Sequence, residues 1–324
     1  MGQLIVDADV MARARFGTSQ LTETLAGLKI LLAPRVLPWH RPWRDTHVDA
    51  LRARLADDPV GAALLRHAFG VTWTADFFTV PPAAPNLGLD EELEYLESLD
   101  DPRIRADLEF TSGPLPPELS ATGLAAVAAG LLRWTWEQTI RDEWDRRLRV
   151  LRADVVSRTA RLSTEGWSGA LENLAPGVRW LANGRLQANA HPYPPRDVRG
   201  SDLMFIAAHT QGSSVSWHLP DRYALVYPVT GALAADPAPL PDALVRLLGA
   251  NRARILARLG TPRSTSALTA ETSLPLGSVG GHLRVLLDAG LLERRRSGRE
   301  VLYWRSATGE ALVEASEAQE PPPA

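Results

Sequence analysis

The chain of 324 residues contains no cysteine. This absence excludes disulfide bonds, thiolate metal sites and a cysteine nucleophile. No run of eighteen or more apolar residues occurs, so the sequence predicts no transmembrane helix. The first residues also lack a basic segment followed by an apolar one, which is the pattern of a secretory signal peptide. We therefore expect a cytoplasmic protein with no membrane partner.

Lysine is almost absent as well, because Lys29 is the only lysine beside thirty-four arginines. Abundant alanine and proline accompany this bias, and together they are typical of a GC-rich bacterial genome. The net charge of -3 hides an uneven distribution. Residues 246–305 carry eleven arginines and four carboxylates, a net charge of +7, whereas residues 1–245 carry -6. A basic segment in an acidic protein is typical of a nucleic-acid-binding module, although a solvated helical face can have the same composition.

The first half of the chain has the spacing of amphipathic helices. Apolar residues recur at Leu21, Leu25, Leu28 and Leu32, and the longest such pattern runs over residues 121–162. We therefore predict that residues 1–165 are mainly helical.

The pattern changes at about residue 166. Apolar runs flank Asn183-Gly184, a dipeptide that favours a β-hairpin, and further strands are expected at 202–208 and 223–229. We predict a small antiparallel sheet in residues 166–236, packed on the helical region, which the strand around Leu4 joins.

Proline residues at 236–242 indicate a linker before a separate module at 240–308. The acidic, proline-rich end, residues 309–324, is predicted to be a disordered tail. The expected fold class is α+β: a mainly helical N-terminal domain with a small antiparallel sheet, followed by a C-terminal winged helix-turn-helix domain.

The order of elements within 240–308 carries the winged-helix prediction. Two helical stretches meet at Gly249, and Ser264 or Thr265 can cap the short helix that follows. A turn at 274–277 leads to a third helix, which Gly290 ends. A basic strand–turn–strand segment follows, and in a winged helix the third helix enters the major groove while the wing contacts the backbone.

The candidate DNA-contacting residues follow from this arrangement. Val279, Leu283, Leu286 and Leu287 form the predicted buried side of the third helix. The candidate recognition residues are Ser278, Gly280, Gly281, His282 and Arg284; the candidate wing residues are Arg294, Arg295, Arg296, Ser297, Gly298 and Arg299; the supporting residues are Ser264, Thr265 and Tyr303.

Residues 240–308 resemble the ArsR-type bacterial regulators. The resemblance is carried by His282, Leu283, Leu286, Ala289, Gly290, Leu291, Gly298 and Tyr303. It implies a homodimeric repressor that binds double-stranded DNA at a palindromic operator. The chain also resembles an actinobacterial subgroup with a large uncharacterised N-terminal domain, through the opening strand and the arginine-rich stretch 12–16.

The sequence departs from the ArsR pattern at several points. Without cysteine, it cannot be a sensor that binds soft metals through thiolates, and no metal site or cofactor is indicated. Pro275 stands where the family tends to have a capping serine. Gly280 and Gly281 replace the usual polar contact residues, so either the helix approaches DNA closely or base readout is reduced.

Other functions compete with DNA binding. The sequence has ten tryptophans, and Trp134, Trp136 and Trp144 lie in the longest helical pattern. Aromatic residues at helical spacing are typical of a core, but an aromatic ligand pocket between helices and sheet is the alternative. Such a pocket would serve an unknown small-molecule effector, and dimerisation is the other role for the N-terminal region. No phosphate-loop, zinc-helix or serine-elbow motif occurs, so we do not expect an enzyme. A protein-interaction module that uses the winged helix as a scaffold is the competing class, with an enzyme in the N-terminal region as a second rival.

Overall fold

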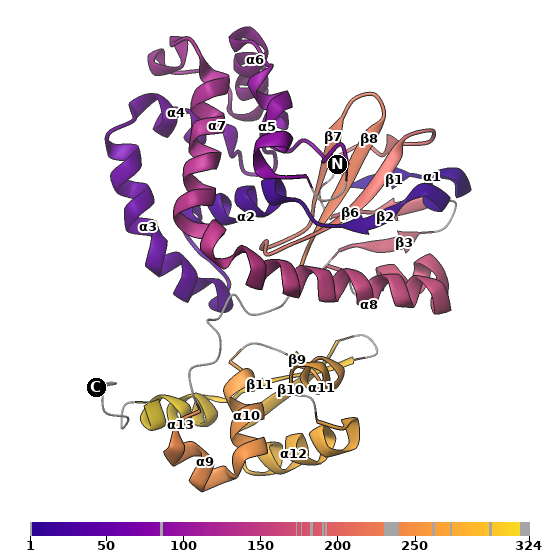
Figure 1. Cartoon of the computed structure of the whole chain (residues 1–324). Helices are drawn as coiled ribbons and strands as arrows, with labels where there is room; N and C mark the ends of the chain where they lie inside the picture. Colours follow the sequence, from indigo (N-terminus) through magenta and orange to yellow (C-terminus); the bar gives the residue numbers. More distant parts are fainter. Residues whose placement is uncertain are drawn as a thin grey trace. The chain divides into compact units, whose positions relative to one another are not determined.

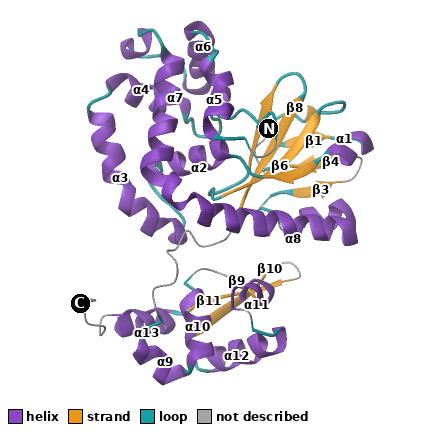
Figure 2. Ribbon diagram, viewed as in Figure 1, coloured by secondary structure: helices purple, strands orange, loops and turns teal. Residues whose placement is uncertain are grey.

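The computed structural model describes residues 2–84, 87–172, 174–175, 177–181, 184–189, 191, 193–229, 240–260, 263–272, 274–297 and 300–317. Contacts divide the chain into a first unit, Met1–Val229, and a second unit, Thr230–Ala324. Both combine helices with strands (Figure 1, Figure 2). The α+β class is confirmed, and the predicted helical and sheet regions of residues 1–229 share one unit.

The helices of the first unit begin at the caps and prolines that the sequence supplies. The Ser19 hydroxyl accepts the N–H of Thr22, and Asp58 and Asp100 cap their helices in the same way. The helices are α1 (Ala8–Arg13), α2 (Gln20–Leu32), α3 (Arg41–Ala56), α4 (Pro59–Ala68), α5 (Leu89–Glu97), α6 (Asp101–Ser112), α7 (Leu124–Thr135) and α8 (Trp144–Leu171), with 3-10 turns at Pro38–His40, Asp76–Phe78, Pro117–Ser120 and Arg141–Glu143.

The longest predicted helical pattern, over residues 121–162, is not one helix. A π turn at Trp136–Ile140 and the 3-10 turn after it separate α7 from α8. The two helices run in different directions, and α8 lies along the sheets (Figure 1). The rings of Trp136 and Trp144 pack edge to face, 5.2 Å apart, at this corner. Apolar spacing continues through the corner because both helices bury one side, so periodicity alone could not locate it.

Two four-stranded sheets complete the first unit. Their orders are β3-β4-β1-β5 and β2-β6-β8-β7. The strands are β1 (Gln3–Ile5), β2 (Arg15–Gly17), β3 (Arg179–Leu181), β4 (Arg185–Gln187), β5 (Arg196–Asp197), β6 (Asp202–Ala208), β7 (Ser214–His218) and β8 (Arg222–Pro228).

The prediction of a small antiparallel sheet is wrong for the sheet β2-β6-β8-β7, although β4 of the other sheet pairs antiparallel with β1 and β3. Strands β6 and β8 pair in parallel, as do β2 and β6, and only β7 runs antiparallel to β8. One face of the central strands, including Met204 and Ile206, packs with Ala26 of α2, while Phe205 and Tyr227 belong to the core on the other face. Strands buried on both faces have continuous apolar runs, as parallel strands do.

The strand around Leu4 joins a sheet, as predicted, because β1 pairs with β4 and β5. The predicted hairpin is also present, with β3 and β4 antiparallel, although Asn183 lies outside the described residues. Gly184 has a φ of 67°, and a Cβ there would lie 2.7 Å from the carbonyl oxygen of Val6. Glycine is therefore required on both counts.

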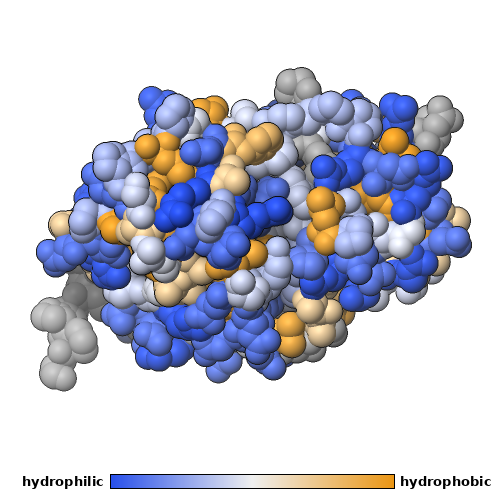
Figure 3. Space-filling view, turned by 90° about the horizontal axis from the view of Figure 1, so that it is seen from above, coloured by the Kyte–Doolittle hydropathy of each residue, from blue (hydrophilic) through white to orange (hydrophobic). Residues whose placement is uncertain are grey.

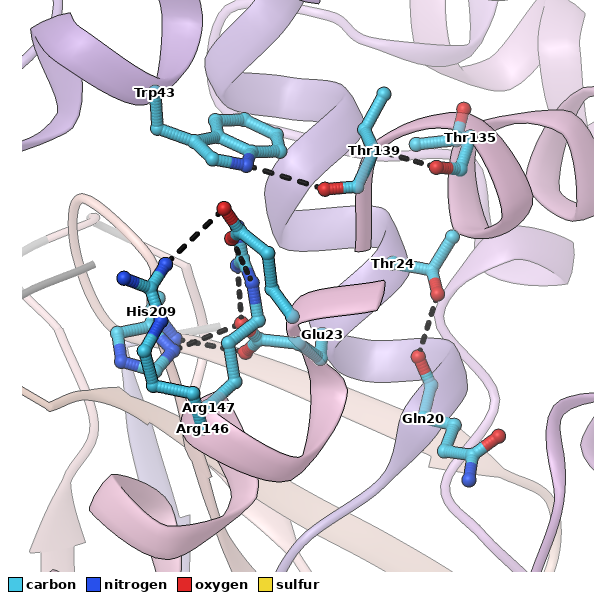
Figure 4. A network of polar contacts seen from close by, with 10 residues as sticks. Gln20, Glu23, Thr24, Trp43, Thr135, Thr139, Arg146, Arg147 and His209 are labelled. Carbon is cyan, nitrogen blue, oxygen red and sulfur yellow. Dashed lines mark hydrogen bonds and ion pairs between the residues drawn. The ribbon is translucent and has the colours of Figure 1, made fainter. Parts of the chain in front are cut away.

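A buried cluster of charged side chains joins α2, α8 and the end of β6. The Glu23 carboxylate accepts hydrogen bonds from Arg147 Nη1 at 2.7 Å and from His209 through its ring Nδ1 at 2.8 Å and its backbone N–H at 3.0 Å. Figure 4 shows the three side chains converging. Burial raises the pKa of Glu23, but His209 and Arg147 outweigh it and hold that pKa well below its usual value. The cluster therefore ties the helices to the sheet through fully buried polar contacts.

The second unit has its own core. Its elements are α9 (Asp242–Leu248), α10 (Ala250–Arg258), β9 (Arg263–Ser264), α11 (Thr265–Thr272), α12 (Leu276–Asp288), β10 (Leu292–Ser297), β11 (Glu300–Arg305) and α13 (Ala307–Glu317), and its sheet order is β10-β11-β9.

The predicted disordered tail from residue 309 is wrong up to Glu317, because this segment belongs to α13. The Ser306 hydroxyl accepts the N–H of Gly309 and caps the helix. Val313 is buried in the core of the second unit. The acidic composition of this segment led to the prediction of disorder, although the sequence contains this cap and the apolar positions that follow it. Residues 318–324 lie outside the described residues.

The surface shown in Figure 3 is mostly hydrophilic, with hydrophobic side chains in small separate patches. Scattered apolar side chains of this kind are normal on a folded protein.

Candidate nucleic-acid interface

Helix α12 packs on the core of the second unit through one stripe of side chains. Val279, Leu283 and Leu286 are each at most 2% exposed, and Leu287 packs at the edge of the same cluster. Their spacing places them on one side of the helix, as predicted. The opposite side of α12 is therefore the side available to a partner.

The beginning of α12 is accessible. Pro275 occupies the N-cap position and supplies no side-chain hydrogen bond, while Leu276, Gly277 and Ser278 are exposed. The first N–H groups of a helix have no acceptor within it, and the helix dipole favours an anion there. This end of α12 suits a phosphate group.

The candidate recognition residues differ in their exposure. Ser278, Gly280, Gly281 and Arg284 are exposed, whereas His282 is half-buried beside the apolar stripe. The glycines leave the backbone of α12 uncovered, because a Cβ on either would meet no atom within 4 Å. The exposed side of α12 thus combines a bare backbone with one arginine.

A Schellman motif ends α12 and directs the chain into the wing. The N–H of Gly290 donates to Leu287 at 2.9 Å, and the N–H of Leu291 donates to Leu286 at 3.0 Å. Gly290 has a φ of 71°, which explains why glycine stands there. The sequence prediction for the end of this helix is confirmed.

The wing is the antiparallel pair β10 and β11. Arg294, Arg295 and Arg296 are all exposed on β10, and successive side chains of a strand point to opposite faces. Ser297 ends β10, but its side chain, like Gly298 and Arg299, lies outside the described residues. Arg294 and Arg296 therefore lie on one face of the wing and Arg295 on the other.

Two arginines counted in the basic segment belong to the interior. Arg305 donates from Nε to the carbonyl oxygen of Leu256 at 2.8 Å and from Nη1 to Glu310 at 3.0 Å. Arg263 is only 7% exposed. The net charge of the segment consequently overstates the charge that a DNA backbone could reach.

The predicted supporting residues lie behind the interface. The Ser264 hydroxyl accepts the N–H of Ala267 at 3.3 Å, so Ser264 rather than Thr265 caps α11, where Thr265 is the first residue. Tyr303 lies on β11 opposite Arg294 and packs against the core. These residues hold α11 and the wing, and α11 contacts α12.

Comparisons with known proteins agree with this geometry. Residues 247–295 match the family described as "Helix-turn-helix domain". The chain therefore carries a helix-turn-helix domain, and the match runs from the end of α9 into the wing strand β10. No curated protein matches the chain.

Two solved structures are similar to parts of the chain. The reduced HlyU protein of Vibrio cholerae has 22% identity over 24% of this chain and 86% of its own, with a TM-score of 0.21. The type III plasmid segregation protein TubR has 16% identity over 28% of this chain and 96% of its own, with a TM-score of 0.23.

No helix in the described part of the chain is long and apolar enough to cross a membrane. No group of three or more histidine, aspartate or glutamate side chains among the described residues is arranged to hold a metal ion.

Proposed function

We propose that this chain is a DNA-binding transcriptional regulator, a repressor of the ArsR type. The observation that carries the proposal is the combination, within a helix-turn-helix domain, of the exposed side of α12 and the arginines of β10. An exposed second helix and a basic wing are the two parts with which winged helices bind duplex DNA.

In this proposal α12 enters the major groove, led by its uncapped N-terminal turn. Ser278 and Arg284 supply hydrogen-bonding side chains, and Gly280 and Gly281 let the helix backbone approach the DNA closely. Arg294, Arg295 and Arg296 contact phosphates, where arginine forms paired hydrogen bonds and displaces counterions. Affinity then depends steeply on salt concentration.

The proposed assembly is a homodimer on a palindromic operator, because two-fold symmetry places two recognition helices on equivalent half-sites. The first unit, with its separate core, then serves dimerisation or the sensing of an effector. The resemblance of residues 240–308 to ArsR-type regulators supports the repressor role.

The decisive experiment measures binding of the full chain to a duplex of random sequence by fluorescence anisotropy at several salt concentrations. We expect replacement of Arg294, Arg295 and Arg296 by alanine to weaken binding and to reduce the salt slope by about 2 to 3, close to one per lost phosphate contact.

A matched control removes the same charge elsewhere. Arg141, Arg149 and Arg152 are exposed arginines of the first unit, and their replacement by alanine should leave the slope unchanged. If the wing variant kept the parent's affinity and salt slope, the proposed role of the wing would be wrong and a protein-interaction role would replace it. If the wing variant does lose affinity and salt dependence, mapping of the DNA that the parent chain binds in its native host would identify the operator.

A further inference from the structure

A cavity of about 80 Å³ lies within the first unit, between its helices and its sheet. It is lined by the last turn of α2, the segment after α4, and strand β7. The residues that line it include Trp73 and Trp217, which contribute indole rings, and Thr74 and Ser214, which contribute hydroxyl groups. These segments are distant in the sequence, so the cavity exists only in the folded unit.

Lys29, the only lysine of the chain, supplies a cation to this cavity. Its Nζ atom lies 5.7 Å from the centre of the Phe69 ring, and no carboxylate in the described part of the chain forms an ion pair with it. Burial lowers the pKa of Lys29 to about 8. An ammonium group without a counter-charge is costly in such a place, and an anion in the cavity would offset that cost.

Asp76, the one carboxylate among the described residues that line the cavity, does not supply this counter-charge. Burial and the nearby Asp107 raise the pKa of Asp76 to about 6, against Trp73, Trp217 and Arg196, which lower it. Lys29 is not among the groups that shift the pKa of Asp76, whereas Arg196 is, and the guanidinium carbon of Arg196 stands 5.0 Å from the Trp217 ring centre.

We propose that this cavity binds a small carboxylic acid in its anionic form, with the Lys29 ammonium as its ionic partner. The hydroxyls of Thr74 and Ser214 can donate hydrogen bonds to the ligand, and Trp73 and Trp217 provide flat apolar walls. Lys29 is the one lysine or arginine among the described lining residues, and its single charge matches that of a carboxylate better than the multiple charge of a phosphate, which proteins usually meet with several donors. That this ligand acts as an effector rests on the proposed DNA-binding function. That the cavity binds a carboxylate does not depend on it.

The single lysine makes a direct test possible. Reductive methylation with isotope-labelled formaldehyde places one reporter on the Lys29 side chain, and the N-terminal amine gives a second, separate signal. Titration with acetate should shift the Lys29 signal saturably, at roughly millimolar concentrations because so small a ligand binds weakly. The bound anion should also raise the apparent pKa of Lys29. Acetamide, its neutral counterpart, and sodium chloride should produce neither effect.

Unmodified protein provides an independent measurement. Acetate should raise the melting temperature of the parent chain, and Lys29→Met should increase the dissociation constant for acetate roughly tenfold or more. Lys29→Arg, which keeps the charge, should retain part of the binding. Asp76→Asn removes the only carboxylate known to line the cavity and should tighten binding.

The results of these measurements distinguish the carboxylate site, its effector role and the proposed DNA binding from one another. Equal shifts with acetate, acetamide and chloride, or equal acetate affinity in the parent and Lys29→Met chains, would overturn the proposal. Acetate binding that leaves DNA affinity unchanged would retain the site and reject the effector role. Loss of DNA binding in the wing variant would leave the acetate measurements unaffected, so the two proposals fail separately.

Discussion

Gly280 and Gly281 lie next to each other on the exposed side of α12, and a Cβ built on either would have no neighbour within 4 Å. Neither glycine is therefore required by the packing of the second unit. Glycine within a helix costs about 1 kcal/mol relative to alanine, and this cost has no compensation inside the fold. Close approach to DNA is the compensation that the proposed function supplies.

Replacement of either glycine by alanine tests this explanation. Gly280→Ala and Gly281→Ala should each stabilise the second unit by about 0.5–1 kcal/mol, because alanine restricts the unfolded chain and favours helix. Each should also weaken DNA binding, because the added methyl group separates α12 from the groove. Thermal unfolding and fluorescence anisotropy measure the two effects.

Gly130 provides the control, since it lies in α7 of the first unit and a Cβ there also has no neighbour within 4 Å. Gly130→Ala should raise stability without changing DNA affinity. If the α12 variants bound DNA as tightly as the parent chain, the glycines would reflect reduced base readout rather than close approach.

Arg305 is expected to be essential for the second unit without touching DNA. Its guanidinium donates to the carbonyl oxygens of Leu256 and Ala257 at the end of α10 and to Glu310 of α13. A hydrogen bond that involves a charged group contributes about 1.5–3 kcal/mol, so Arg305→Met should destabilise this unit by at least about 3 kcal/mol. Hydrogen exchange of the α10 amides measures the loss. Arg294→Met, which removes an exposed arginine, should leave that exchange unchanged but weaken DNA binding.

The winged helix could be predicted from the sequence because its signals are local. The spacing of Val279, Leu283 and Leu286 determines the buried side of α12, and Gly290 determines its end. The interior position of Arg305 could not be predicted, because its partners on α10 are almost fifty residues earlier in the chain. Counting charges along the sequence therefore exaggerated the basic surface.

In the first unit, contacts between residues that are distant in the sequence could not be predicted from local patterns. An aromatic pocket was only the alternative to a core in the sequence analysis, and no residues could be assigned to it, since the rings of Trp73 and Trp217 meet through packing that no short-range pattern encodes. Lys29 stood out as the single lysine, but only the fold places it in the cavity. The parallel pairing of β6 and β8 had a signal in their unbroken apolar runs, which periodicity of two does not describe.

Glu92 should make the stability of the first unit depend on pH near neutrality. Its carboxylate accepts the N–H of Leu21 at 2.6 Å and the hydroxyl of Ser19 at 2.8 Å, and burial raises its pKa to about 7. The folded state holds the Glu92 carboxyl proton more tightly than the unfolded state. The stability that Glu92 contributes is therefore fully present below about pH 4.5 and is lost as pH rises to about 7.

The expected loss over that range is about 3 kcal/mol, from 1.36 kcal/mol per unit of pKa. Glu92→Gln can still accept both hydrogen bonds but cannot ionise, so it should remove this pH dependence. Denaturant unfolding of both chains between about pH 4 and pH 8 measures the difference. Glu94→Gln, at an exposed position of the same helix, is the control and should follow the parent curve. Parallel curves for Glu92→Gln and the parent would contradict the prediction.

Glu23 should have the opposite pH dependence. Its pKa is held low in the folded state, so the stability that it contributes is present above about pH 4.5, its ordinary unfolded value, and is lost as pH falls further. Glu23→Gln should destabilise the first unit by about 3–5 kcal/mol near neutral pH, because it leaves the buried Arg147 without its fully buried partner. This destabilisation, measured against the parent chain, should shrink as the pH is lowered.

Glu143 provides a comparison at the same arginine. Its carboxylate also pairs with Arg147, at 3.1 Å, but its side chain is 30% exposed. Glu143→Gln should therefore cost less than Glu23→Gln, since water can replace part of the lost interaction and Glu23 still neutralises the guanidinium. Equal costs for the two variants would mean that burial does not determine the strength of this cluster, and that the link between α2, α8 and β6 depends on packing instead.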